Sequence, residues 1–100
     1  MFVCVGTYAR PLVDSDEELI TAHRAYLDEL YRGGQLVASG PREPRIGGLI
    51  VARGADDVAV RKLLAADPFV MSGLVEYELL RFTPSKGAHP DLIENYAPAG

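Results

Sequence analysis

The chain has 100 residues, 48% of them apolar, and a formal net charge of −4. This length suits one domain, because two half-sized cores would each bury too little surface. A negative chain without a basic run is unsuited to holding phosphates, so we expect no nucleic-acid partner. No apolar run approaches the roughly 18 residues that span a bilayer, and no secretory leader opens the chain. We therefore expect no membrane partner and a cytoplasmic location.

Residues 1–8 are apolar on both alternating faces, which predicts a central strand that is covered on both sides. Cys4, the only cysteine, lies within this apolar run. It has no partner for an internal disulfide and no neighbouring positive charge in the sequence. We therefore predict a small core residue and not a reactive thiol.

Residues 15–32 are predicted to form a helix. Ser15 and Glu18 match the capping box, which places the start of the helix at Ser15, and two glycines at 33–34 end it. His23 falls on the apolar stripe that this helix should bury, formed by Leu19, Ile20, Tyr26, Leu27 and Leu30. A titratable imidazole on a buried face needs a polar partner, so His23 is the first candidate for a functional residue.

The remaining pattern predicts strands at residues 35–39, 49–52 and 74–82, and a second helix from Asp56 or Asp57 to Asp67-Pro68. Residues 69–73 are predicted to be a loop or one short turn. The order strand, helix, strand, strand, helix, strand is typical of an α+β ferredoxin-like domain. Such a domain has a four-stranded antiparallel sheet with both helices on one face.

The other face of the predicted sheet is apolar and has no helix to cover it. We therefore expect two copies to pack face to face, as a homodimer or a higher homo-oligomer. Residues 84–100 are interrupted by proline and glycine. They are predicted to form a separate C-terminal arm that lies over another subunit, with one helical turn at 91–96.

Residues 1–83 resemble the YciI-like (YCII-related) family. The segments that carry the resemblance are His23-Arg24, Leu27, Leu30, Gly34-Gln35-Leu36, Ser39-Gly40-Pro41, Gly48, Val51, Asp67-Pro68-Phe69, Gly73 and a strand that ends at Phe82. The resemblance implies a dimeric α+β barrel of ferredoxin-like protomers. It also implies a cleft in which His23 and Asp67 form a catalytic pair.

The same resemblance implies that the turn Ser39-Gly40-Pro41 belongs to the cleft wall. Together with Arg24 and Phe69, this turn makes up the predicted binding site for a small-molecule ligand. Some members of the family are associated with dehydrochlorination of chlorinated hydroxyquinol-type aromatics. The chemistry that we expect is therefore general acid–base catalysis by the pair on a small, cyclic or aromatic oxygenated molecule, with a dehydrochlorinase-like lyase or an isomerase as the open alternatives.

The sequence holds two distant histidines and no C-x-x-C, G-x-G-x-x-G or P-loop, so we expect no metal and no cofactor. Two other functions stay open. The cleft can belong to a non-catalytic module that binds or senses a small molecule. The chain can also be an accessory subunit of an assembly in which the pair is only structural, since a histidine on an apolar helix face often bonds within the core.

Overall fold

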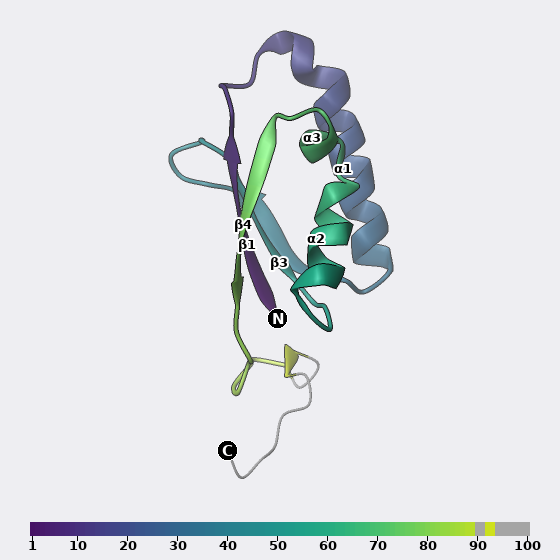
Figure 1. Cartoon of the computed structure of the whole chain (residues 1–100), viewed down its shortest axis with the longest axis vertical. Helices are drawn as coiled ribbons and strands as arrows, with labels where there is room; N and C mark the ends of the chain where they lie inside the picture. Colours follow the sequence, from purple (N-terminus) through teal and green to yellow (C-terminus); the bar gives the residue numbers. More distant parts are fainter. Residues whose placement is uncertain (90–91, 94–100) are drawn as a thin grey trace.

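The computed structural model describes residues 1–89 and 92–93 (Figure 1). Its elements are β1 (Phe2–Tyr8), the 3₁₀ turn η1 (Asp14–Asp16), α1 (Glu17–Arg32), β2 (Leu36–Pro41), β3 (Gly48–Ala52), α2 (Asp57–Ala65), α3 (Pro68–Met71) and β4 (Val75–Arg81). The sheet is antiparallel in the order β2-β3-β1-β4. Figure 1 shows α1, α2 and α3 on one side of it. This is the predicted α+β ferredoxin-like fold.

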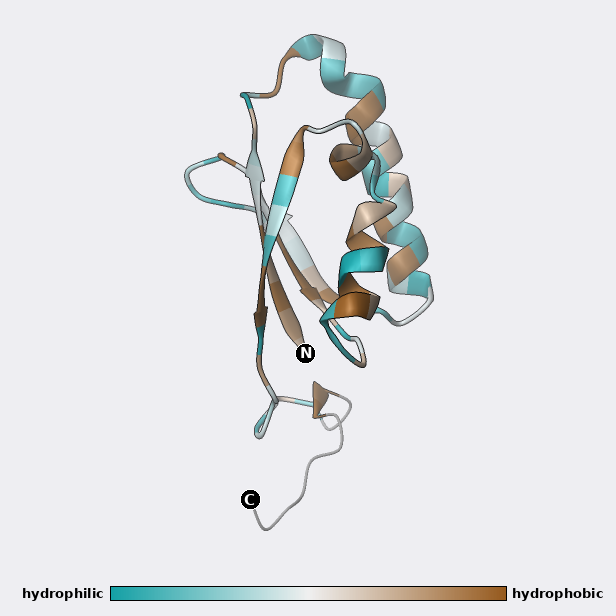
Figure 2. Cartoon of the chain, viewed as in Figure 1, coloured by the Kyte–Doolittle hydropathy of each residue, from teal (hydrophilic) through white to brown (hydrophobic). Residues whose placement is uncertain are grey.

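The core lies between the sheet and the helices. Phe2 and Cys4 of β1 are fully buried, and Cys4 pairs across the sheet with Ile50 of β3 on one side and Leu79 of β4 on the other. Figure 2 shows the apolar character of the first half of β1 and of α3. Successive strand residues alternate between faces, so these inward positions belong to one continuous apolar layer.

The start of α1 differs from the prediction: Ser15 does not cap the helix, so the predicted capping box is wrong. Asp16 is buried, and its carboxylate accepts two hydrogen bonds of 2.8 Å from Arg10 and one of 2.9 Å from the backbone N–H of Val13. These bonds hold Asp16 inward and create η1, so that α1 begins at Glu17. A side chain outside the local motif therefore decides where the helix starts.

The other helix ends agree with the pattern. Gly34, just past the end of α1, has a φ of 75°, which a glycine adopts without strain. The carboxylate of Asp56 caps α2 by accepting a hydrogen bond of 2.9 Å from the N–H of Ala59. The short turn expected after Asp67 is the four-residue helix α3.

The outer face of the sheet, opposite the helices, is defined here by the apolar residues Val3, Val5, Leu49, Val51 and Leu80. Leu49 and Leu80 are 39% and 54% exposed. After β4 the chain runs on past the end of the sheet (Figure 1). The helical turn predicted at 91–96 lies mostly outside the described residues. None of the helices within residues 1–89 and 92–93 is long and apolar enough to cross a membrane.

Candidate active site

His23 and Asp67, 44 positions apart in the sequence, form a hydrogen-bonded pair. The imidazole Nδ1 lies 2.8 Å from one carboxylate oxygen of Asp67 and 2.9 Å from the other. The side chain of Asp67 is 1% exposed and that of His23 is 15% exposed. An ionised carboxylate only accepts hydrogen bonds, so the proton lies on Nδ1 and Nε2 carries a free lone pair in the neutral ring.

Asp67 is also the N-cap of α3. Its carboxylate accepts a second hydrogen bond, of 2.9 Å, from the backbone N–H of Phe69. Pro68 occupies the first helical position, where its missing N–H costs nothing. The turn of α3 therefore orients the carboxylate toward α1, and α1 presents His23 to it from the apolar stripe.

The ring of Phe69 supports the imidazole. The two rings are stacked, with 3.9 Å between their centroids and 5° between their planes. Tyr8, at the end of β1, meets Phe69 edge-on at a centroid distance of 6.2 Å. Stacking on one face and hydrogen bonding on one edge leave the imidazole little freedom to rotate.

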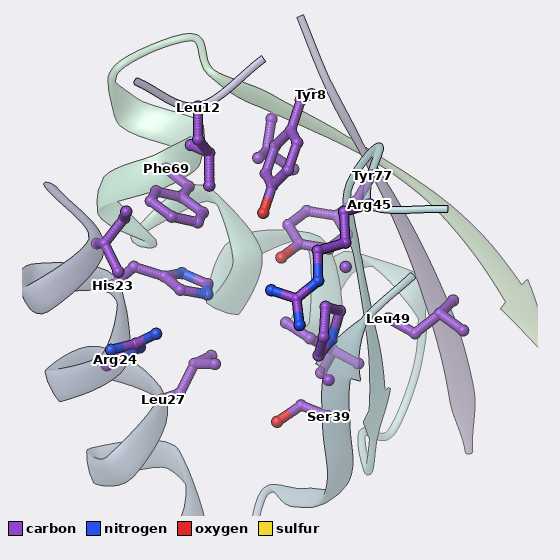
Figure 3. A pocket seen from close by; sticks show the side chains of 16 residues that line it. Tyr8, Leu12, His23, Arg24, Leu27, Ser39, Arg45, Leu49, Phe69 and Tyr77 are labelled. Atoms are coloured by element: carbon purple, nitrogen blue, oxygen red, sulfur yellow. The ribbon is translucent and has the colours of Figure 1, made fainter. Parts of the chain in front are cut away.

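A cavity of about 360 Å³ opens beside the imidazole, between α1 and the inner face of the sheet (Figure 3). Its walls combine aliphatic side chains with a few polar groups. The lining residues are Tyr8, Leu12, Ile20, His23, Arg24, Leu27, Ser39, Gly40, Pro41, Arg45, Gly48, Leu49, Ile50, Phe69, Val75 and Tyr77. Asp67 is not among them, because it lies behind His23.

The structure gathers the residues that the sequence predicted for the site. His23, Arg24 and Phe69 line the cavity from the helices. Ser39, Gly40 and Pro41 line it from the end of β2, where they pair with β3 as strand residues, so the predicted turn at 39–41 is wrong. The hydroxyl of Ser39 shares a hydrogen bond of 2.6 Å with that of Tyr31 on α1. The structure thus brings the predicted site residues close together, while their catalytic and ligand-binding roles stay predictions.

Three polar lining residues were not predicted: Tyr8, Arg45 and Tyr77. Tyr77 has the same parity in β4 as the inward-facing Val75, so the alternation contained a signal for it. Burial, followed by the nearby charge of Asp67, raises the pKa of the Tyr77 hydroxyl. This hydroxyl therefore stays protonated at neutral pH and can donate a hydrogen bond to a ligand. Arg45 lies in a loop without periodicity, which gave no signal.

The described residues contain no group of three His, Cys, Asp or Glu side chains that could hold a metal ion. The chemistry that the site can support by itself is proton transfer at Nε2 of His23. Asp67 would stabilise the positive charge that the ring acquires when it takes up a proton.

Fold and site together define a ferredoxin-like α+β protein whose cleft is lined by a histidine that is hydrogen-bonded to a buried aspartate. The model of the YCII-related domain matches residues 1–83, and the chain belongs to this family, as its motifs predicted. Curated protein sequences include no significant match.

One solved structure with a similar fold is 5-chloro-2-hydroxyhydroquinone dehydrochlorinase (TftG) from Burkholderia phenoliruptrix AC1100, in complex with 2,5-dihydroxybenzoquinone. The similarity has a TM-score of 0.66 and 19% sequence identity, and it covers 94% of this chain and 100% of that one. At this level of identity the likeness establishes a common fold.

Proposed function

We propose that the chain is an enzyme in which His23 acts as a general acid–base on a small oxygenated ring compound. The observation that carries the proposal is the asymmetry of the imidazole. Its Nδ1 is bound by the buried carboxylate of Asp67, whereas the ring itself lines an open cavity. A structural histidine has no need of a cavity, but a proton-transfer group must reach its substrate.

Nε2 of His23 takes a proton from a hydroxyl or a carbon of the substrate, and the ring becomes an imidazolium. Asp67 stabilises this cation, and such a positioned base contributes about 10²–10⁴-fold to the rate. In an elimination, the electron pair left on the substrate moves into its ring, and a leaving group such as chloride departs with its bonding pair. In an isomerisation, the imidazolium returns the proton to another atom of the substrate.

The size and polarity of the cavity support a single ring as the substrate. A volume of about 360 Å³ is at the small end of the ~300–1,000 Å³ that ligand sites span. Its aliphatic walls suit a flat ring, and the hydroxyls of Tyr8, Ser39 and Tyr77 suit ring oxygens. The dehydrochlorinase of similar fold, which is named for a chlorinated hydroxyhydroquinone, supports the same substrate class.

The test is chloride release from 5-chloro-2-hydroxyhydroquinone, followed with a chloride electrode and by the absorbance of the quinone. The wild type should release chloride, and His23→Asn should reduce the rate at least about 100-fold. His89→Asn is the matched control, because His89 is exposed and does not line the cavity. Circular dichroism checks that each variant is folded.

Release at the wild-type rate by His23→Asn would contradict the proposal. If the wild type binds the ring and no product forms, the non-catalytic binding module becomes the better description. In that case Asp67→Asn should change the affinity for the ring, and again no product should form.

We also propose that a second copy of the chain covers the outer face of the sheet. This face carries the apolar side chains of Val3, Val5, Val51 and Leu80, with Leu80 54% exposed, and Glu78 lies beside Val5. An apolar strip of this kind favours association with an identical face. Sedimentation should show a dimer for the wild type and a monomer for Leu80→Asp. Val58→Asp, at a site on α2 that is 69% exposed against 54% for Leu80, should stay dimeric. A monomeric wild type would contradict the proposal.

A further inference from the structure

The charged side chains that line the cavity are all positive. Arg24 and Arg45 are its charged residues, and no aspartate or glutamate is among the described residues that line it. The carboxylate of Asp67, behind His23, is buried and already bound to the imidazole. A chain with a net charge of −4 thus has a positively charged cavity.

Both arginines are available to a ligand. Neither Arg24 nor Arg45 has a hydrogen bond or an ion pair with the residues that the structure describes. Both are exposed, so neither pays a large cost for being unpaired in the absence of a ligand. A guanidinium with all five N–H donors free is well suited to an anionic oxygen.

The loop that carries Arg45, residues 42–47, is held against β1. The carbonyl of Ile46 accepts a hydrogen bond of 2.8 Å from the N–H of Tyr8, and Arg42 donates one of 3.0 Å to the hydroxyl of Thr7. Gly47 packs so closely on the backbone of Gly6 that there is no room for a Cβ. The base of the Arg45 side chain is therefore positioned by contacts that are independent of a ligand.

In Figure 3 the guanidinium of Arg45 extends into the space that the His23 ring faces. The hydroxyls of Tyr8 and Tyr77 point into the same space. A ligand that contacts Nε2 of His23 on one side would therefore meet Arg45 on another.

We propose that Arg45 is the anion-binding residue of this site and that its ligand is a flat ring with a negatively charged oxygen substituent, either a carboxylate or an ionised ring hydroxyl. Two adjacent oxygens on such a ring match the paired N–H groups of the guanidinium. The inference names the substrate class for the site described under the proposed function, and it rests on that function only in assuming that the ligand occupies the same cavity.

The position of Arg45 also has a consequence for catalysis. When His23 removes a proton, negative charge develops on a ring oxygen of the substrate. A guanidinium already directed at that oxygen stabilises the charge without reorganisation, which is the most effective form of electrostatic catalysis. Arg45 would thereby bind the ground state and also favour the transfer.

The experiment compares anionic rings with neutral rings of the same skeleton, by isothermal titration calorimetry. The probe pairs are 2,5-dihydroxybenzoquinone against 2,5-dimethoxybenzoquinone, and benzoate against benzamide. The wild type should bind at least one anion in preference to its neutral partner. Arg45→Gln should weaken binding of that anion about 10- to 100-fold, the loss expected for a hydrogen bond between charged groups, and should leave the neutral partner unchanged.

Arg32→Gln is the matched control, because Arg32 is exposed at the end of α1 and does not line the cavity. It removes the same charge from the protein and should change anion binding less than about twofold, since a remote exposed charge is screened by salt. Arg45→Lys should restore part of the affinity, because it keeps the charge and loses the paired geometry.

The inference is overturned if neither anion binds better than its neutral partner, or if Arg45→Gln binds the anion as the wild type does. These outcomes are distinct from failure of the proposed function. Binding of unreactive probes is measured without turnover, and His23→Asn should still prefer the anion. If the anion binds through Arg45 while no substrate is ever converted, the inference holds and the enzymatic proposal fails.

Discussion

The imidazole of His23 lies flat on the ring of Phe69, and both residues are bound to one carboxylate. Asp67 accepts hydrogen bonds from the ring Nδ1 of His23 and from the backbone N–H of Phe69. The segment Asp67-Pro68-Phe69 thus performs three tasks at once. It caps α3, starts the helix with proline and offers the imidazole both a charged partner and a flat support.

The first prediction concerns this support. Phe69→Leu should lower the free energy of unfolding by about 1–3 kcal/mol, because a buried ring and its stacking contact are lost. Urea denaturation measures the effect. Met71→Leu on the same helix is the control, since Met71 is 74% exposed and should change stability by less than about 0.5 kcal/mol. Equal effects of the two substitutions would show that the stacking contributes nothing.

The second prediction concerns acid stability. Hydrogen bonds from Arg10, and next from the N–H of Val13, lower the pKa of Asp16 to about 2. The native state therefore binds this proton more weakly than the unfolded chain. The contribution of Asp16 to the free energy of unfolding is complete above its ordinary pKa of about 4 and is lost as the pH falls from there through about 2.

Asp16→Asn should remove this contribution. Its urea midpoint should change less than that of the wild type between about pH 5 and pH 2, where the two states differ in protonation. The exposed neighbour Asp14 provides the control, and Asp14→Asn should retain the wild-type pH dependence. An Asp16→Asn curve parallel to that of the wild type would refute the assignment.

The third prediction concerns the contact that holds the loop at residues 42–47. A methyl group at Gly47 would overlap the backbone carbonyl of Gly6, whereas one at Gly40 would meet nothing within 4 Å. Gly47→Ala should therefore cost at least about 1–3 kcal/mol of unfolding free energy, as overpacking does. Gly40→Ala should cost little, and thermal unfolding of the pair measures the difference. Comparable melting temperatures would mean that the loop adapts freely.

The fourth prediction concerns the buried thiol. Burial raises the pKa of Cys4 to about 11, so very little thiolate exists at pH 8. A disulfide reagent such as 5,5′-dithiobis(2-nitrobenzoate) should label the native protein only as fast as local opening exposes Cys4, and should label it within seconds in denaturant. Labelling of the native protein as fast as that of a small-molecule thiol would contradict the buried position.

The elements that follow local rules were predicted well. The apolar stripe of α1 identified His23 as a buried titratable residue, and the residues around it are indeed buried or half-buried. The glycines after Arg32 and the aspartate before α2 end and start their helices as expected. Hydrophobic period and capping depend on residues a few positions apart, which a sequence displays directly.

The features that depend on distant contacts were missed. Ser15 was predicted to cap α1 from its capping-box pattern. Arg10 instead binds the carboxylate of Asp16, and α1 begins at Glu17. Nothing in the sequence indicated that Arg45 belongs to the site, because a loop has no hydrophobic periodicity. The position of this arginine in the cavity wall depends on the hydrogen bond between Tyr8 and Ile46, which holds the loop against β1.

The amino-acid sequence by itself determined the order of the elements, the ferredoxin-like class and the membership of the YCII-related family, since each depends on composition and on spacings along the chain. Only the tertiary structure decided that, among the residues it describes, two unpaired arginines and no acid line the cavity beside the pair. The physical reason is that a cavity and its charge arise where α1, β1 and the loop at 42–47 converge. Nothing in the local sequence of any one of these segments reports where the others will lie.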